Sequence, residues 1–273
     1  MIQLINEFLS FDFIKRALLV GTLVSLCAAL LGVSLVLKRY SMIGDGLSHV
    51  GFGALSIAMA LNLAPLQVSV PVVIIAAFFL LKLSENSKIK GDSAIALISS
   101  SAIAIGVIAT SLSKGMNTDV MSFMFGSALS ITDSDAKISI ILSTFVIILF
   151  ILFYNKIFAV TFDESFAKAS GTNVKIYNML IAFLTAITIV IGMRIMGTML
   201  ISSLIIFPAL SSMRVFKTFK NVIISSALIS IFCFGIGIFA SFIYEIPAGA
   251  SVVVTNLIIF IFFCMVGYII KKK

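Results

Sequence analysis

The stretch "KRYSMIGDGLSHVGFGALS" (Lys38–Ser56) places ionisable side chains at the start of an apolar segment. It contains His49, the only histidine of the 273-residue chain, and Asp45 four residues earlier. Two residues with this spacing share one face of a helix. Gly53 and Ser56 continue the same face with small or polar side chains. The pattern predicts an apolar helix that carries one polar stripe.

The rest of the chain is apolar enough to require a membrane. Hydrophobic residues make up 61% of it and charged residues 11%, against about 45–50% and about 25% in soluble domains. Its apolar runs, such as "VPVVIIAAFFLLKL" (Val70–Leu83), are continuous, whereas the strands of a membrane barrel alternate polar and apolar residues. We expect an all-α, polytopic membrane helical bundle in contact with lipid, in the cell membrane.

The apolar segments predict about nine transmembrane helices. At about 20 residues per span, nine helices use most of the chain, so we expect a single transmembrane domain over residues 1–273. A short re-entrant helix is expected at Asn117–Ile131, where surrounding protein would have to bury it. The nine segments are Ala17–Leu37, Gly46–Leu63, Leu66–Leu83, Ser93–Leu112, Ile138–Ala159, Ile176–Met193, Gly197–Met213, Val222–Ile243 and Gly249–Ile270.

The basic residues predict the orientation of the bundle. Nine spans place the two termini on opposite sides of the membrane. With the C-terminus inside, fourteen of the 19 Lys and Arg residues fall on the inside and five on the outside. Basic residues gather on cytoplasmic loops, so we expect the N-terminus outside and the C-terminus inside. The same rule accounts for the net charge of +8 without a nucleic-acid partner.

Asp45 and His49 suit a divalent metal. Carboxylate oxygen and imidazole nitrogen both bind zinc and related ions, but one pair supplies only two ligands. Two copies of the chain about a twofold axis would supply four. In the alternative interpretation, His49 forms a hydrogen bond across helices and Asp45 caps the N-terminus of its helix. Spacing alone leaves both interpretations open.

The segment "TFDESFAKASGTNVKIYN" (Thr161–Asn178) is the longest charged, amphipathic segment on the predicted inside. Gly171 offers a stop for a helix within it. A cytoplasmic helix that docks on a partner and a plain connector both fit this pattern.

Catalysis by this chain alone is not expected. The sequence contains no G-x-x-x-x-G-K-[ST] motif for binding ATP, and a single histidine excludes an H-E-x-x-H zinc site.

Several segments together resemble the membrane permease of the zinc and manganese class of ABC uptake transporters. They occur in the expected order and span nearly the whole chain, and the G-D-x-L-[SA]-H element is the most specific of them. Beside the first quoted stretch they are "DVMSFMFGSALSIT" (Asp119–Thr132), "FDESFAKASGTNVK" (Phe162–Lys175), "GTMLISSLIIFPALSSMR" (Gly197–Arg214) and "EIPAGASVVV" (Glu245–Val254).

This resemblance implies a homodimeric or pseudo-dimeric permease without a tightly bound cofactor, working by alternating access. Its partners would be cytoplasmic ABC ATPase subunits, which hydrolyse ATP, and an extracellular metal-binding protein. Asp45 and His49 would lie on the metal path. The segment from Phe162 to Lys175 would form the coupling helix that docks on the ATPase; its coupling residues would be Phe162, Asp163, Glu164, Phe166, Lys168 and Gly171.

The sequence leaves alternatives open for the transported ion and for the class of protein. The short chain, "SHV" after Gly46 and the "EIPAG" turn resemble zinc-uptake members, so we expect Zn²⁺, with Mn²⁺ or iron as the alternative. Three other hypotheses are less favoured: a secondary metal transporter without an ATPase, a membrane enzyme and an assembly subunit. Gly46 and the "FGA" that follows Gly51 depart from the commoner family pattern and are expected to loosen the helix around the metal pair.

Overall fold

The computed structural model describes residues 8, 10–86, 91–112, 126, 132–198 and 201–272. Most of the expected re-entrant segment at Asn117–Ile131 lies outside these residues, as does most of the "DVMSFMFGSALSIT" segment.

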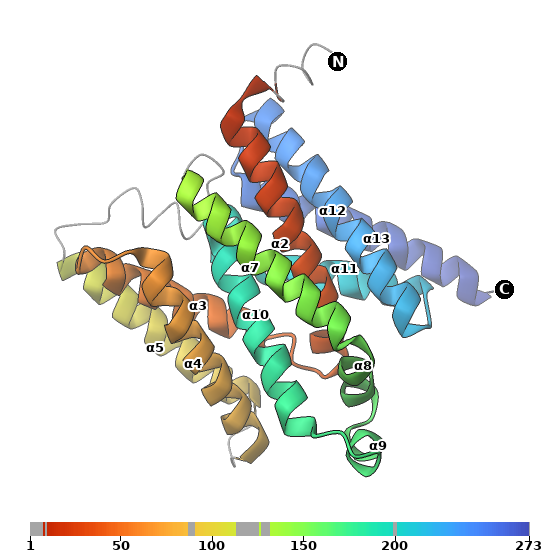
Figure 1. Ribbon diagram of the computed structural model, residues 1–273. Coiled ribbons are helices and arrows are strands. Elements are labelled where there is room, and N and C mark those ends of the chain that lie inside the picture. The colour runs from red at the N-terminus through yellow and green to blue at the C-terminus, as the bar shows by residue number, and fades with distance from the viewer. Residues whose placement is uncertain are drawn as a thin grey trace.

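Every regular element among the described residues is an α-helix, which confirms the all-α prediction (Figure 1). In lipid, helices satisfy the hydrogen bonds of their backbone within one segment. The helices are α2 (Asp12–Leu37), α3 (Ile43–Ala60), α4 (Pro65–Asn86), α5 (Gly91–Leu112), α7 (Asp133–Leu152), α8 (Tyr154–Phe162), α9 (Glu164–Ala169), α10 (Val174–Met196), α11 (Ile201–Val215), α12 (Phe219–Tyr244) and α13 (Ala248–Lys272).

Within the described part of the chain, seven helices are long and apolar enough to cross a membrane. Two of the nine predicted spans are not among these seven. They correspond to α3, whose 18 residues include Asp45 and His49, and α11, which has only 15 residues. Gly44 of α3 faces Ser202 and Ile205 of α11, so these two helices meet inside the bundle. The count of nine crossings stays a prediction.

A membrane-length helix lies at the predicted span Ile138–Ala159, but the predicted end of that span is wrong. α7 ends at Leu152, Phe153 leaves helical geometry, and α8 begins at Tyr154 as a separate helix. Phe158 and Phe162 of α8 place their rings 5.0 and 5.8 Å from the ring of Phe219, at the start of α12. The break redirects the chain so that these aromatic side chains pack together, although the sequence contains neither Gly nor Pro there.

The core of the bundle lies around α2 and α10. Most residues of both helices are buried, whereas few residues of α13 are. α10 contacts α4 and α3 on one side and α2 and α7 on the other, and it joins the α3–α5 group to the rest of the bundle (Figure 1).

The two ends of α12 define two ends of the molecule. Phe8, near the N-terminus, packs against Phe239 and Phe242 in the last turns of α12. The first residue of α12, Phe219, lies beside α8, which leads directly into α9. Phe8 and the start of α2 therefore lie at the opposite end of the bundle from α9 (Figure 1). Which end faces the cytoplasm stays a prediction.

Candidate metal pair and coupling segment

The candidate metal pair, Asp45 and His49, lies in a continuous helix. α3 runs unbroken from Ile43 to Ala60, so the expected loosening by its glycines is wrong. These glycines are instead points of close helix packing. A Cβ on Gly46 would lie 2.8 Å from Ile95 of α5, and a Cβ on Gly51 would lie 2.4 Å from Met193 of α10. Small residues let membrane helices approach closely, so the glycines fix α3 against its neighbours.

Asp45 and His49 approach each other along one face of α3. Asp45 Oδ2 lies 3.5 Å from His49 Nε2, and the two side chains are 36% and 14% exposed. Asp45 lies in the first turn, but Met42 is the N-cap and no side chain caps the helix. The capping interpretation of Asp45 therefore has no hydrogen bond behind it, although the helix dipole still favours a carboxylate there.

The pair is an incomplete ligand set. No cluster of three or more His, Cys, Asp or Glu side chains able to hold a metal occurs among the described residues. Stable zinc sites use three or four protein ligands. Two ligands from one chain suit a site that binds an ion briefly or that a second chain completes.

The predicted coupling segment contains a short helix with a defined start and stop. Asp163 Oδ1 accepts a hydrogen bond of 2.9 Å from the backbone N–H of Phe166 and caps α9. At the other end, Gly171 has a φ of +80°, and the N–H of Thr172 donates to the carbonyl of Ala167. This is the glycine-terminated ending that the sequence predicted.

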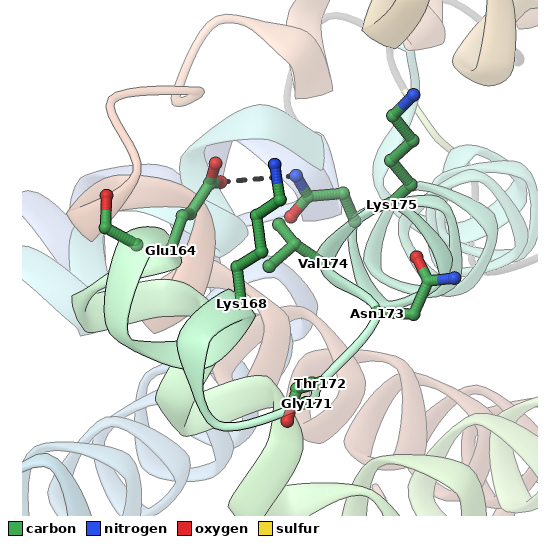
Figure 2. A pocket seen from close by; sticks show the side chains of 9 residues that line it. Glu164, Lys168, Gly171, Thr172, Asn173, Val174 and Lys175 are labelled. Carbon is green, nitrogen blue, oxygen red and sulfur yellow. Dashed lines mark hydrogen bonds between the residues drawn. The ribbon is translucent and has the colours of Figure 1, made fainter.

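The same segment presents apolar side chains outward. Ala167 of α9 is buried, whereas the side chains of Phe162 and Phe166 are 57% and 67% exposed. Beside them, a pocket of about 610 Å³ opens between α9 and the start of α10, with Lys168 and Lys175 on its lining (Figure 2). The structure thus brings the predicted coupling residues into one exposed surface.

Sequence reasoning missed two residues that hold this segment in place. Glu164 Oε1 lies 2.5 Å from the ammonium of Lys38 and accepts a hydrogen bond of 3.2 Å from the side-chain amide of Asn178. Burial raises the pKa of Glu164, but these hydrogen bonds and the charge of Lys38 outweigh it and lower the pKa overall. Lys38 and Glu164 are 126 residues apart, so no local pattern signals their contact.

Comparison with known proteins identifies the family. The family described as "ABC 3 transport family" matches residues 10–267, nearly the whole chain. The chain belongs to this ABC 3 transport family. It is therefore a multi-pass protein of the cell membrane and a transport component rather than an enzyme.

Relatives of this ABC 3 chain cover nearly its full length. It is 28% identical to the manganese import system permease protein ScaB of Streptococcus gordonii, over 99% of this chain and 97% of that protein. It is also 28% identical to the high-affinity zinc uptake system membrane protein ZnuB of Haemophilus influenzae, over 92% and 96% of the two chains.

A solved structure shares the fold of this ABC 3 chain. It is similar to a chain of the structure titled PsaBC from Streptococcus pneumoniae in complex with Fab, with a TM-score of 0.87 and 28% identity. The match covers 96% of this chain and 95% of that one, so the two share one architecture throughout.

Proposed function

We propose that this chain is the permease subunit of an ATP-driven importer of a divalent metal ion. The observation that carries the proposal is the Asp45–His49 pair, 3.5 Å apart on a helix fixed among α4, α5, α10 and α11. Ionisable side chains within membrane helices are costly and tend to be functional, and these two are metal ligands by chemistry. Relatives named for manganese import and zinc uptake support the same reading.

The working unit is a homodimer of single-domain chains, each spanning residues 1–273. Two copies would bring two carboxylates and two imidazoles to one metal path and complete a four-ligand shell. Because the ligands come from two chains, such a shell opens when the chains move apart, and a transport site must release what it binds.

Two partners belong to this proposal. Cytoplasmic ABC ATPase subunits supply ATP hydrolysis and dock on the coupling segment around α9, where Phe162 and Phe166 are exposed and Lys168 lies beside them. An extracellular metal-binding protein delivers the ion to the opposite end. Nucleotide binding then moves α9, and the bundle alternates between outward and inward access.

Zinc is the first candidate for the transported ion, because the sequence features described above resemble zinc-uptake members. Manganese is the second candidate. Manganese has its own support, because the S. gordonii relative is named as a manganese permease. Carboxylate and imidazole groups bind both ions, so a transport measurement is needed to distinguish zinc from manganese.

The test is uptake of radioactive zinc and manganese, run in parallel in cells that produce the permease, its ATPase and its binding protein. Asp45→Ala and His49→Ala should each remove most uptake of one ion at normal membrane levels of the permease. Glu245→Gln, which changes a carboxylate outside the pair, is the matched control. Full uptake in both variants would show that the metal path does not include Asp45 and His49.

A second measurement separates ATP-driven import from secondary transport. The purified chain is placed in vesicles with and without its ATPase. Metal flux should require the ATPase and ATP. Flux by the chain alone along an ion gradient would overturn the ATP-driven mechanism.

A further inference from the structure

Lys38 carries a buried charge at the end of α2. Its side chain is only 6% exposed. The ammonium lies 2.5 Å from Glu164 Oε1, 2.7 Å from Asn178 Oδ1 and 3.3 Å from the carbonyl oxygen of Val160. One side chain therefore joins the end of α2 to α8, α9 and α10.

The contacts of this group form a closed network. Asn178 donates to the same oxygen of Glu164 that faces Lys38, the bond drawn as a dashed line from Glu164 in Figure 2. A buried ammonium that loses its partners is strongly unfavourable, because it has left water and has nothing in its place. If α9 moved without Lys38, the ammonium would keep only the neutral oxygens of Asn178 and Val160 and would lose its one charged partner, Glu164. The ion pair therefore favours movement of Lys38 together with α9.

Beyond Lys38, the chain leads directly to the metal pair through a hydrogen-bonded turn. Arg39 adopts a left-handed conformation with φ of 61°. The N–H of Arg39 donates to Val36 and that of Tyr40 donates to Leu35, at 3.1 and 2.8 Å. This pattern of bonds closes the end of α2 firmly. Asp45 follows seven residues after Lys38, in the first turn of α3.

We propose that Lys38 is a positioning residue that links α9 to the metal pair, so that movement of α9 shifts the turn between α2 and α3. The inference rests on the proposed function, in which the ATPase docks on α9 and the ion passes Asp45 and His49. Lys38 contacts neither the ion nor the ATPase. It acts through Glu164 on one side and through the backbone of residues 39–45 on the other.

The test measures the number of ions imported per ATP hydrolysed. The permease, its ATPase and its binding protein are reconstituted in vesicles, and metal uptake and phosphate release are followed in the same sample. Lys38→Met should lower this ratio about tenfold, within the range of coupling between distant sites. Glu164→Gln, which changes a half-exposed side chain, should lower it similarly. The double variant should be no worse than either single one, because both break the same link.

Lys156→Met is the matched control. Lys156 lies in α8 at the same end of the bundle and donates to the Thr172 hydroxyl after α9, at 3.3 Å, without reaching α2. The number of ions imported per ATP hydrolysed by Lys156→Met should equal that of the wild type. Lys38→Arg keeps the charge and should retain more coupling than Lys38→Met.

Three results would overturn the inference. They are an unchanged ratio in both Lys38→Met and Glu164→Gln, multiplied losses in the double variant, or an equal loss in Lys156→Met. Failure of the proposed function is a different result, since the wild-type complex would then import no metal on addition of ATP.

Discussion

Gly53 of α3 faces the backbone carbonyl of Ala102 in α5, and a Cβ on Gly53 would lie 2.7 Å from that oxygen. Gly106 lies on the same contact, where an added Cβ would meet Gly53 Cα at 3.1 Å. The two helices therefore approach backbone to backbone through these glycines. This contact holds the helix that carries Asp45 and His49.

Gly53→Ala should destabilise the chain by about 1–3 kcal/mol, because backbone atoms would have to shift. The measurement is thermal unfolding in detergent, followed by circular dichroism. Gly235→Ala in α12 is the control, since an added Cβ there meets nothing within 4 Å. Equal stability of the two variants would contradict the close contact between α3 and α5.

Gly171→Ala should destabilise the end of α9 by about 1–2 kcal/mol through its backbone alone. The left-handed conformation is the cause, because no atom lies within 4 Å of the added Cβ. Gly171→Asn should lose less, since Asn tolerates this conformation better. Hydrogen exchange of the α9 amides measures the difference, and equal protection in both variants would contradict it.

Asp163→Ala should remove the N-cap of α9 and weaken the helix by about 1 kcal/mol. If α9 must be helical to dock, the affinity for the purified ATPase should fall roughly fivefold. Asp163→Ser, which can still accept the hydrogen bond from Phe166, should keep most of the affinity. A loss as large in the serine variant would show that the charge matters rather than the cap.

The Lys38–Glu164 contact should weaken in acid. The pKa of Glu164 is lowered from its usual 4.5 in the folded chain. Its contribution to stability is therefore complete above the unfolded value and is lost as the pH falls through the folded value. Glu164→Gln should be less stable than the wild type at neutral pH, and the difference should shrink below about pH 4.5. Thermal unfolding across pH 3–7 measures it, and a constant difference would contradict the lowered pKa.

Some features of the site could be read from the sequence because they are local. Four residues of spacing were enough to place Asp45 and His49 on one face of α3. The end of α9 at Gly171 was likewise predictable, since a glycine that can adopt positive φ stops a helix within a few residues. Asp163 directly precedes α9, and its capping hydrogen bond with Phe166 is also a local feature.

Other features depend on contacts that no local pattern records. The break at Phe153 lies in a continuous apolar run, and packing of Phe158 and Phe162 on Phe219 accompanies it. The glycines of α3 looked like points of weakness in the sequence. In the fold they are contacts with α5, α10 and α11, because close helix packing leaves no room for side chains there.

The sequence by itself determined that this chain is a helical membrane protein with a polar pair on one helix. Composition fixes the solvent, and in lipid the backbone must form its hydrogen bonds within helices. Only the tertiary structure decided how α9 is tied to the turn before Asp45 and His49. That tie joins Lys38 to Glu164 and Asn178, 126 and 140 residues away, and a buried charge finds such partners only when the whole bundle has packed.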